Sequence, residues 1–283
     1  MLDGLRTYEL DEIKQCFQAE KFPLSGITPL GSAEFHFTEP ARYLGVTLHA
    51  GSLVRPGLTD SMSVSPGDRF REEDPYTDLF IEDFPVRIIA RDSRFEYDLN
   101  WEIEESIYAA DKKKWGLQVW NRELTEDERE LTCRKYREFY ALMDLATEFM
   151  LGTGSPVVIF DMHAFCYQRD HRIHWTGDGK PVINLGTRYI NRKFFTPLID
   201  AFLGGISETV IDGHPLRVAE NELFPGGYIT RKYAQLHNRR VLVLAIEYKK
   251  IFMDEWSGEF YLDKFHILRK DFIHAKERVI QML

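Results

Sequence analysis

Short, nearly continuous runs of apolar residues recur along the chain and predict β-strands. Such runs occupy residues 43–50, 86–90, 157–164, 181–186, 216–221 and 241–249. Several of them are continuous rather than alternating, which is typical of strands that are covered on both faces of a sheet. The pattern therefore predicts a sheet buried between layers of other elements.

Helical periodicity separates some of these runs. The segment 124–151 opens with Thr125 and Glu128 at the spacing of a capping box, and its apolar positions then follow one helical face. Segments 192–206 and 263–283 are also predicted to be helices. Strands that alternate with helices favour an α/β fold. We expect one catalytic domain over residues 1–283, a three-layer sandwich around a mixed, mostly parallel sheet.

The stretch from residue 51 to residue 85 differs from its surroundings, because it is polar, rich in Gly, Pro and Asp, and has little periodicity. It is predicted to be a long loop. Loops of that length in a compact domain are often functional.

Composition and net charge limit the kinds of molecule that the protein is expected to bind. The 283 residues are 44% hydrophobic and 29% charged, which is ordinary for a globular protein. The 36 basic and 45 acidic residues give a net charge of −9, which argues against nucleic acid as a partner but leaves room for a local cationic pocket. No apolar run approaches the roughly 18 residues of a membrane span. The N-terminal segment lacks the pattern of a signal peptide, and three scattered cysteines suggest no disulfide framework, so we expect a cytoplasmic protein.

Chemically active side chains stand at the ends of three predicted strands. The first strand ends on His49, the third on Asp161 and His163, and the last carries Glu247 after an apolar run. Ligands of α/β sheets bind outside the carboxyl ends of the strands. Two histidines with a carboxylate are a ligand set for a catalytic zinc ion that keeps an open position for water, and a further carboxylate suits a general base. Asp161 is placed to orient an imidazole.

Simpler structural roles exist for each of these residues. A single histidine at a strand end is more often a hydrogen-bonded structural residue, Asp161 suits a turn cap, and Glu247 could form a buried salt bridge. Motifs of other chemistries are missing: the sequence has no P-loop, dinucleotide fingerprint, nucleophile elbow or HExxH. A nucleophilic Cys166 has no supporting feature.

An ordered set of short motifs resembles the N-formylglutamate amidohydrolase family, which is related to the zinc carboxypeptidases. The motifs follow the family order over nearly the whole chain. They are HAG (49–51), TDLFIED (77–83), SRFEYDLN (93–100), FDMHAF (160–165), INLGT (183–187), NELFPGGYITRKY (221–233) and LAIEYKKIFMDE (244–255).

The resemblance implies a zinc-dependent amide hydrolase with a carboxypeptidase-like sheet. It would place His49 and His163 on Zn²⁺ and make Glu247 the base and proton shuttle. Zinc carboxypeptidases take a third ligand three residues after the first histidine, but that position here is Ser52. The resemblance therefore turns attention to the acidic segment TDLFIED, in which Asp78 is the first choice and Glu82 the second.

The other motifs suit a small substrate that carries a carboxylate. Arg94 and Arg231 could grip a carboxylate or polarise the scissile carbonyl, because arginine offers a two-pronged donor. The further substrate-binding candidates are Asn100, Asn221, Gly226 and Gly227.

One position departs from the family pattern. Trp101 stands where the family commonly has an arginine after Asp-x-Asn, so the formylglutamate specificity is open. A catalytically inactive small-molecule binding protein and a carboxypeptidase-like peptide hydrolase are the alternatives. The sequence leaves the oligomeric state undetermined.

Overall fold

The computed structural model describes residues 4–168, 174–206 and 209–283, and the chain divides into two compact units. The N-terminal unit comprises Met1–Gly154 and the C-terminal unit Ser155–Leu283. Each unit combines helices with a sheet that contains both parallel and antiparallel strands. This confirms the predicted α/β class with a mixed sheet.

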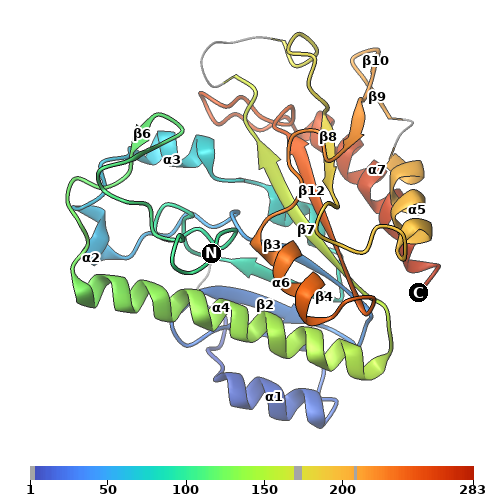
Figure 1. The fold of residues 1–283 in the computed structure, drawn as a ribbon, viewed down its shortest axis with the longest axis horizontal. Helices are drawn as coiled ribbons and strands as arrows, with labels where there is room; N and C mark the ends of the chain where they lie inside the picture. Colours follow the sequence, from blue (N-terminus) through green and yellow to red (C-terminus); the bar gives the residue numbers. More distant parts are fainter. Residues whose placement is uncertain (1–3, 169–173, 207–208) are drawn as a thin grey trace. The chain divides into compact units, whose positions relative to one another are not determined.

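Four strands of the N-terminal unit lie in the order β1 (Leu24–Ile27), β2 (Ala33–Phe37), β4 (Val86–Ala90) and β3 (Tyr43–Thr47). Figure 1 labels the last three of them. The pair β3 and β4 is parallel, whereas β1 with β2 and β2 with β4 are antiparallel. The strands predicted at 43–50 and 86–90 are confirmed. β1 and β2 escaped prediction because they alternate buried and half-buried residues over only a few positions.

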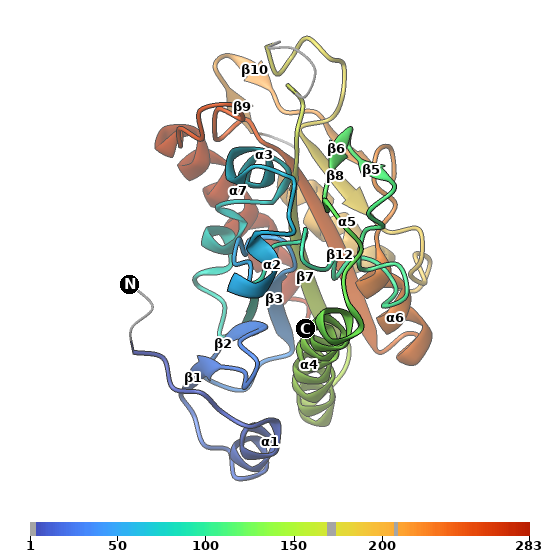
Figure 2. The same ribbon diagram turned by 90° about the vertical axis from the view of Figure 1, so that its left-hand side faces the viewer.

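Two helices of this unit pack through aromatic rings. α1 (Leu10–Gln18) lies next to α4 (Glu126–Thr153) in Figure 2. The ring of Phe17 stacks on that of Phe149 at a centroid distance of 4.5 Å and contacts Phe37 of β2 at 5.1 Å. These aromatic contacts fix α1 against α4 and against β2 of the sheet.

The predicted capping box begins α4. The Thr125 hydroxyl accepts a hydrogen bond from the Glu128 amide at 3.3 Å, and the Glu128 carboxylate accepts one from the Thr125 amide at 2.8 Å. Hydrogen bonds from Arg122 and Thr125 lower the pKa of Glu128 to about 2. The helix start therefore depends on an ionised Glu128.

We expect Thr125→Ala to lower the free energy of unfolding by about 1 kcal/mol. Glu128→Gln should cost stability at neutral pH, and its difference from the wild type should shrink as pH falls from about 4.3 toward 2. The sign follows from the lowered pKa, since a carboxylate favoured in the folded state loses its contribution on protonation. Urea unfolding, monitored by the circular dichroism of the helices at pH 7 and pH 2, measures the stability of both variants. An equal Glu128→Gln effect at the two pH values would contradict this account.

The segment from residue 51 to residue 85 is not one long loop. It contains the short helices α2 (Pro56–Thr59), α3 (Pro66–Glu72) and η1 (Thr77–Ile81). Pro56 and Pro66 begin the first two, as their fixed φ angle favours. With four to seven residues each, these helices are too short to show a periodic apolar pattern.

In the C-terminal unit the strands lie in the order β7 (Val157–Phe165), β12 (Val241–Lys249), β8 (Ile183–Gly186) and β11 (Val218–Glu220). β7 and β12 are parallel, β12 and β8 antiparallel, and β8 and β11 parallel. All four were predicted from their apolar runs. A small hairpin of β9 (Val210–Ile211) and β10 (His214–Pro215) accompanies them.

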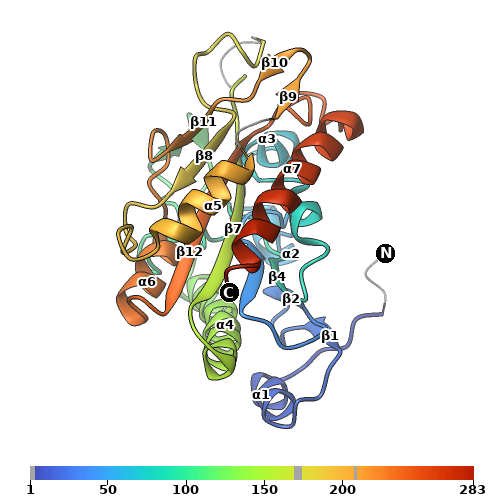
Figure 3. The ribbon, with the colours of Figure 1, turned by 90° about the vertical axis from the view of Figure 1, so that its right-hand side faces the viewer.

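Three helices complete this unit: α5 (Thr196–Ile206), α6 (Tyr228–Leu236) and α7 (Leu262–Ile280). α5 and α7 lie side by side in Figure 3. The backbone of Gly205 on α5 closely approaches Ala275 on α7, so that a Cβ atom would lie 2.6 Å from the Ala275 Cα. Phe202 and Phe272 both contact the ring of Phe160 on β7, which anchors the helix pair on its strand. In the parts of the chain that the structure describes, no helix has the length and apolar character needed to cross a membrane.

Candidate active site

His49 lies just beyond the end of β3, in a close approach of two backbone segments. A Cβ atom on Gly51 would lie 2.3 Å from the carbonyl carbon of Arg91, so only glycine fits at this point. The His49 side chain is 1% exposed. The HAG motif thus lets two backbone segments approach closely and buries an imidazole.

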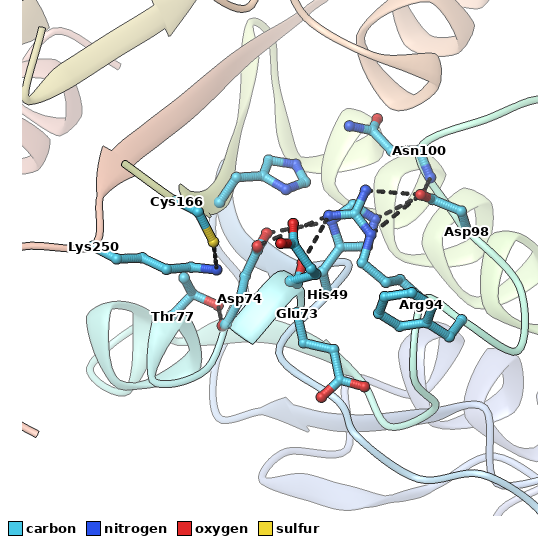
Figure 4. A network of polar contacts seen from close by, with 12 residues as sticks. His49, Glu73, Asp74, Thr77, Arg94, Asp98, Asn100, Cys166 and Lys250 are labelled. Carbon is cyan, nitrogen blue, oxygen red and sulfur yellow. Dashed lines mark hydrogen bonds and ion pairs between the residues drawn. The ribbon is translucent and has the colours of Figure 1, made fainter. Parts of the chain in front are cut away.

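Two carboxylates contact the His49 ring (Figure 4). Its Nε2 lies 2.8 Å from Asp98 Oδ1, and its Nδ1 lies 3.3 Å from Asp74 Oδ2. Asp74 is held in place through its own backbone, because its amide donates to the His49 carbonyl at 2.9 Å and its carbonyl accepts from the Thr77 hydroxyl at 2.7 Å.

Asp98 is fully buried and receives hydrogen bonds from several donors. Arg94 Nη2 donates to its Oδ2 at 2.8 Å, the Tyr108 hydroxyl donates to the same oxygen, and the Asn100 amide donates to Oδ1 at 2.9 Å. Burial by itself would raise the pKa of Asp98, but the positive charge of Arg94 and the contacts from His49 and Tyr108 hold it well below its usual range. An ionised carboxylate only accepts, so His49 Nε2 carries the proton that it donates to Asp98 Oδ1.

The long helix α4 supports the segment that carries Arg94 and Asp98. Lys135 on α4 forms an ion pair of 2.7 Å with Asp92, and the Tyr136 hydroxyl donates to the Trp101 carbonyl at 2.8 Å. Arg94 and Asp98 pair in the interior, where the ion pair holds the carboxylate that contacts the His49 imidazole.

Asp78 lies on η1 in a different environment. Burial raises the pKa of its carboxyl group, and the negative charges of Glu34 and Glu82 add to that shift. The carboxylate next to His49 is instead that of Asp74, which the sequence reasoning did not name. The acidic run Glu72-Glu73-Asp74 ahead of Pro75 was the available signal.

In the C-terminal unit, His163 and Glu247 are direct neighbours on adjacent parallel strands. Aligned residues of a parallel pair share one face of the sheet, so both side chains project to the same side. Asp161, two residues earlier on that face, has its Oδ1 3.0 Å from His163 Nε2 and is fully buried. The Asp161 carboxylate is therefore within ion-pair distance of the His163 imidazole.

Buried polar residues surround the ends of these two strands. Lys250 Nζ lies 3.5 Å from Cys166 Sγ (Figure 4). The Glu255 carboxylate accepts from the Tyr167 amide at 2.7 Å, and burial raises its pKa. Sequence reasoning did not single out Lys250 or Glu255, although charged residues directly after a buried strand were a usable signal.

The remaining predicted substrate residues lie on the loop after β11 and on α6. Asn221 has a φ angle of +57° and accepts from the Thr187 amide at 2.8 Å, so its side chain holds two loops together. Gly226 has a φ angle of +109°, and Gly227 is the N-cap of α6. Arg231 on α6 lies over the Tyr189 ring at 5.6 Å. Asn184 on β8 fixes this region by donating to the Phe224 carbonyl at 2.8 Å.

Comparisons with known proteins agree with this arrangement of motifs. The model of a family described as N-formylglutamate amidohydrolase matches residues 42–253. The solved structure of an N-formylglutamate amidohydrolase from Ralstonia eutropha JMP134 is similar, with 20% identity, a TM-score of 0.68, and coverage of 86% of this chain and 94% of that one.

A second similar structure is the gene product Atu2144 from Agrobacterium tumefaciens, with 18% identity and a TM-score of 0.59 over 85% of this chain and 91% of that one. A metallo-carboxypeptidase from Burkholderia cenocepacia is more distant, with 14% identity and a TM-score of 0.39 over 96% of this chain and 69% of that one. No curated protein matches.

Proposed function

Because the chain belongs to the N-formylglutamate amidohydrolase family, we propose that it is a zinc-dependent amidohydrolase. Its substrate class is an N-acyl amino acid similar to N-formylglutamate, and residues 1–283 act as one catalytic domain. The observation that supports a bound metal ion is the environment of His49, whose imidazole lies between two buried carboxylates. Family membership supports amide hydrolysis, and the donor groups support a metal.

The donor geometry of His49 and Asp74 fits zinc. With Nε2 protonated toward Asp98, Nδ1 faces Asp74 Oδ2 at 3.3 Å. Either a proton on Nδ1 or a metal ion can hold this nitrogen beside the carboxylate. Imidazole nitrogen and carboxylate oxygen are both ligand types of Zn²⁺, so Nδ1 and Oδ2 would provide two of its ligands.

We assign the ligands to His49, Asp74 and His163, each of which offers one donor atom. All three are almost completely buried. Asp98 supplies to His49 the outer hydrogen bond that metal-bound histidines commonly have, and the Asp161 carboxylate lies 3.0 Å from His163 Nε2. Two imidazoles and one carboxylate form a catalytic zinc set with room for a water molecule.

When bound, zinc would act as a Lewis acid that makes water a nucleophile at neutral pH and polarises the amide carbonyl. The Glu247 carboxylate accepts a proton from the attacking water and returns it to the amine nitrogen as the C–N bond breaks. Arg94 keeps Asp98 ionised, and Asp98 keeps the proton of His49 on Nε2. For Arg231, Asn100 and the loop of Gly226 and Gly227, substrate binding stays a prediction.

The choice between Asp74 and Asp78 as third ligand is testable. We expect Asp74→Asn to lower zinc affinity by at least about 100-fold, because a neutral amide replaces an anionic ligand. Asp78→Asn is the matched control and should retain zinc. Competition with a chromogenic chelator measures both affinities. Loss of zinc from the Asp78 variant with retention by the Asp74 variant would reverse the assignment.

Metal analysis followed by a substrate screen tests the function as a whole. Protein purified without added zinc should contain close to one equivalent and hydrolyse N-formyl or other N-acyl amino acids. Trp101 in place of a family arginine motivates one alternative, a binding protein without catalysis. That alternative predicts no zinc, no turnover, and ligand affinity unchanged in His49→Ala. Turnover of peptides alone would instead indicate a carboxypeptidase-like hydrolase.

A further inference from the structure

A short hairpin of the N-terminal unit presents one lysine to a group of aromatic rings. Its strands are β5 (Lys113–Lys114) and β6 (Leu117–Gln118). Trp115 and Gly116 form the tight turn with φ angles of +50° and +83°. Two positive φ angles are the signature of the hairpin turns that match strand twist, so the position of Lys114 is fixed by the backbone.

The Lys114 ammonium group lies on three rings. Its Nζ is 4.5 Å from the centroid of Trp101, 5.1 Å from that of Tyr108 and 5.2 Å from that of Trp115. Each distance is within the range of a cation–π contact. Three aromatic rings therefore hold the ammonium group of Lys114 in place.

These rings connect Lys114 to the candidate active site. The Tyr108 hydroxyl donates to Asp98, the carboxylate that orients His49. The guanidinium of Arg94 lies on the Trp115 ring at 4.5 Å. The Tyr108 ring thus contacts Lys114, while its hydroxyl contacts Asp98 of the His49 network.

The charges around Lys114 are unbalanced. Arg94 is already paired with Asp98 at 2.8 Å. Within residues 4–168, 174–206 and 209–283, no carboxylate lies within ion-pair distance of Lys114 Nζ. Burial lowers the pKa of the Lys114 ammonium group, and the more distant charges of Asp98 and Glu105 only partly oppose this. A partly buried cation without an anionic partner favours the binding of an anion from solution.

We propose that Lys114 is a substrate-binding residue that selects a carboxylate remote from the scissile amide, as in the side chain of an N-acyl glutamate. This inference rests on the proposed amidohydrolase function. Because Lys114 is separated from His49 by Tyr108, it contacts the far end of the substrate rather than the reacting carbonyl. Trp101 and Trp115 shape the same region and pack against the apolar part of the substrate side chain.

Three variants test the role. Lys114→Met removes the charge with similar length, Lys114→Arg keeps it, and Lys113→Met removes an exposed charge from the neighbouring position of the same hairpin. The substrates are N-formyl-L-glutamate and N-formyl-L-glutamine, which differ only in the remote carboxylate. Binding of glutarate, measured by calorimetry, provides a readout that is independent of turnover.

We expect Lys114→Met to raise KM for N-formyl-L-glutamate at least about tenfold, with kcat within about twofold. The same variant should leave N-formyl-L-glutamine unaffected, and Lys114→Arg should restore most of the loss. Equal losses on both substrates, or no loss on the glutamate substrate, would overturn the proposal. So would an equal effect of Lys113→Met.

Failure of the proposed function gives a different result. If the wild type hydrolyses neither substrate, the amidohydrolase assignment fails and glutarate binding decides the role of Lys114. Affinity that is about tenfold weaker in Lys114→Met, and unchanged in Lys113→Met, would sustain the anion site. Equal affinities, or no binding by the wild type, would refute it.

Discussion

Glu247→Gln should reduce kcat about 1,000-fold while the protein keeps its zinc, because general acid–base catalysis contributes about 10²–10⁴ in rate. The amide retains the size of the carboxylate but cannot accept a proton at neutral pH. Since Glu247 is aligned with His163 on the neighbouring strand, the substitution changes the chemistry of this face without changing the register. The expected loss corresponds to about 4 kcal/mol of transition-state stabilisation.

The measurement pairs steady-state turnover of an N-acyl amino acid with metal analysis on the same preparation. Glu259→Gln, which removes an exposed carboxylate from the turn after β12, is the control and should behave as the wild type. Full activity in Glu247→Gln would exclude Glu247 as the base. Loss of zinc together with activity would instead make Glu247 part of the metal site.

His163→Ala should abolish zinc binding, leaving less than about 0.1 equivalents after purification, and should reduce turnover by at least about 1,000-fold. The reason is that a site with three protein ligands loses one donor that the small alanine side chain cannot replace. Asp161→Asn should have a smaller effect, about 10–100-fold in zinc affinity, because it removes only a negative charge that lies 3.0 Å from the His163 ring.

His214→Ala is the control for histidine removal, because His214 is exposed on the hairpin of β9 and β10. Zinc content, chelator competition and turnover are measured for the three variants in parallel. Near-stoichiometric zinc in His163→Ala would remove this residue from the ligand set. An Asp161→Asn protein with unchanged affinity would show that Asp161 serves only the packing of β7.

Wild-type protein stripped with a chelator offers a further check on His49. Without metal, a proton on Nδ1 is the other way to reconcile the imidazole with Asp74 at 3.3 Å. Zinc added back to the stripped wild type should restore activity, whereas the chelator-stripped Asp74→Asn protein should gain none. This result would show that activity requires a zinc ion, rather than a proton, between His49 Nδ1 and Asp74.

The apolar runs by themselves determined β7, β8, β11 and β12 of the C-terminal unit and β3 and β4 of the N-terminal unit. A continuous apolar run has few alternatives to a buried strand, because its side chains must leave water whichever way the chain turns. The capping box similarly determined the start of α4, since its hydrogen bonds join residues three positions apart. The motif order also placed the chain in its family, and the residue types at the strand ends indicated a functional site.

Only the tertiary structure decided which side chains meet. Asp74, rather than Asp78, lies next to His49, because the pairing depends on how the short helices between residues 51 and 85 fold back onto the end of β3. Lys114 reaches Trp101 and Tyr108 through a hairpin whose two-residue strands leave no periodic signal. Such contacts join positions far apart in sequence, and sequence spacing carries no information about them. Local patterns thus determined the elements, whereas the chemistry of the candidate site depends on long-range packing.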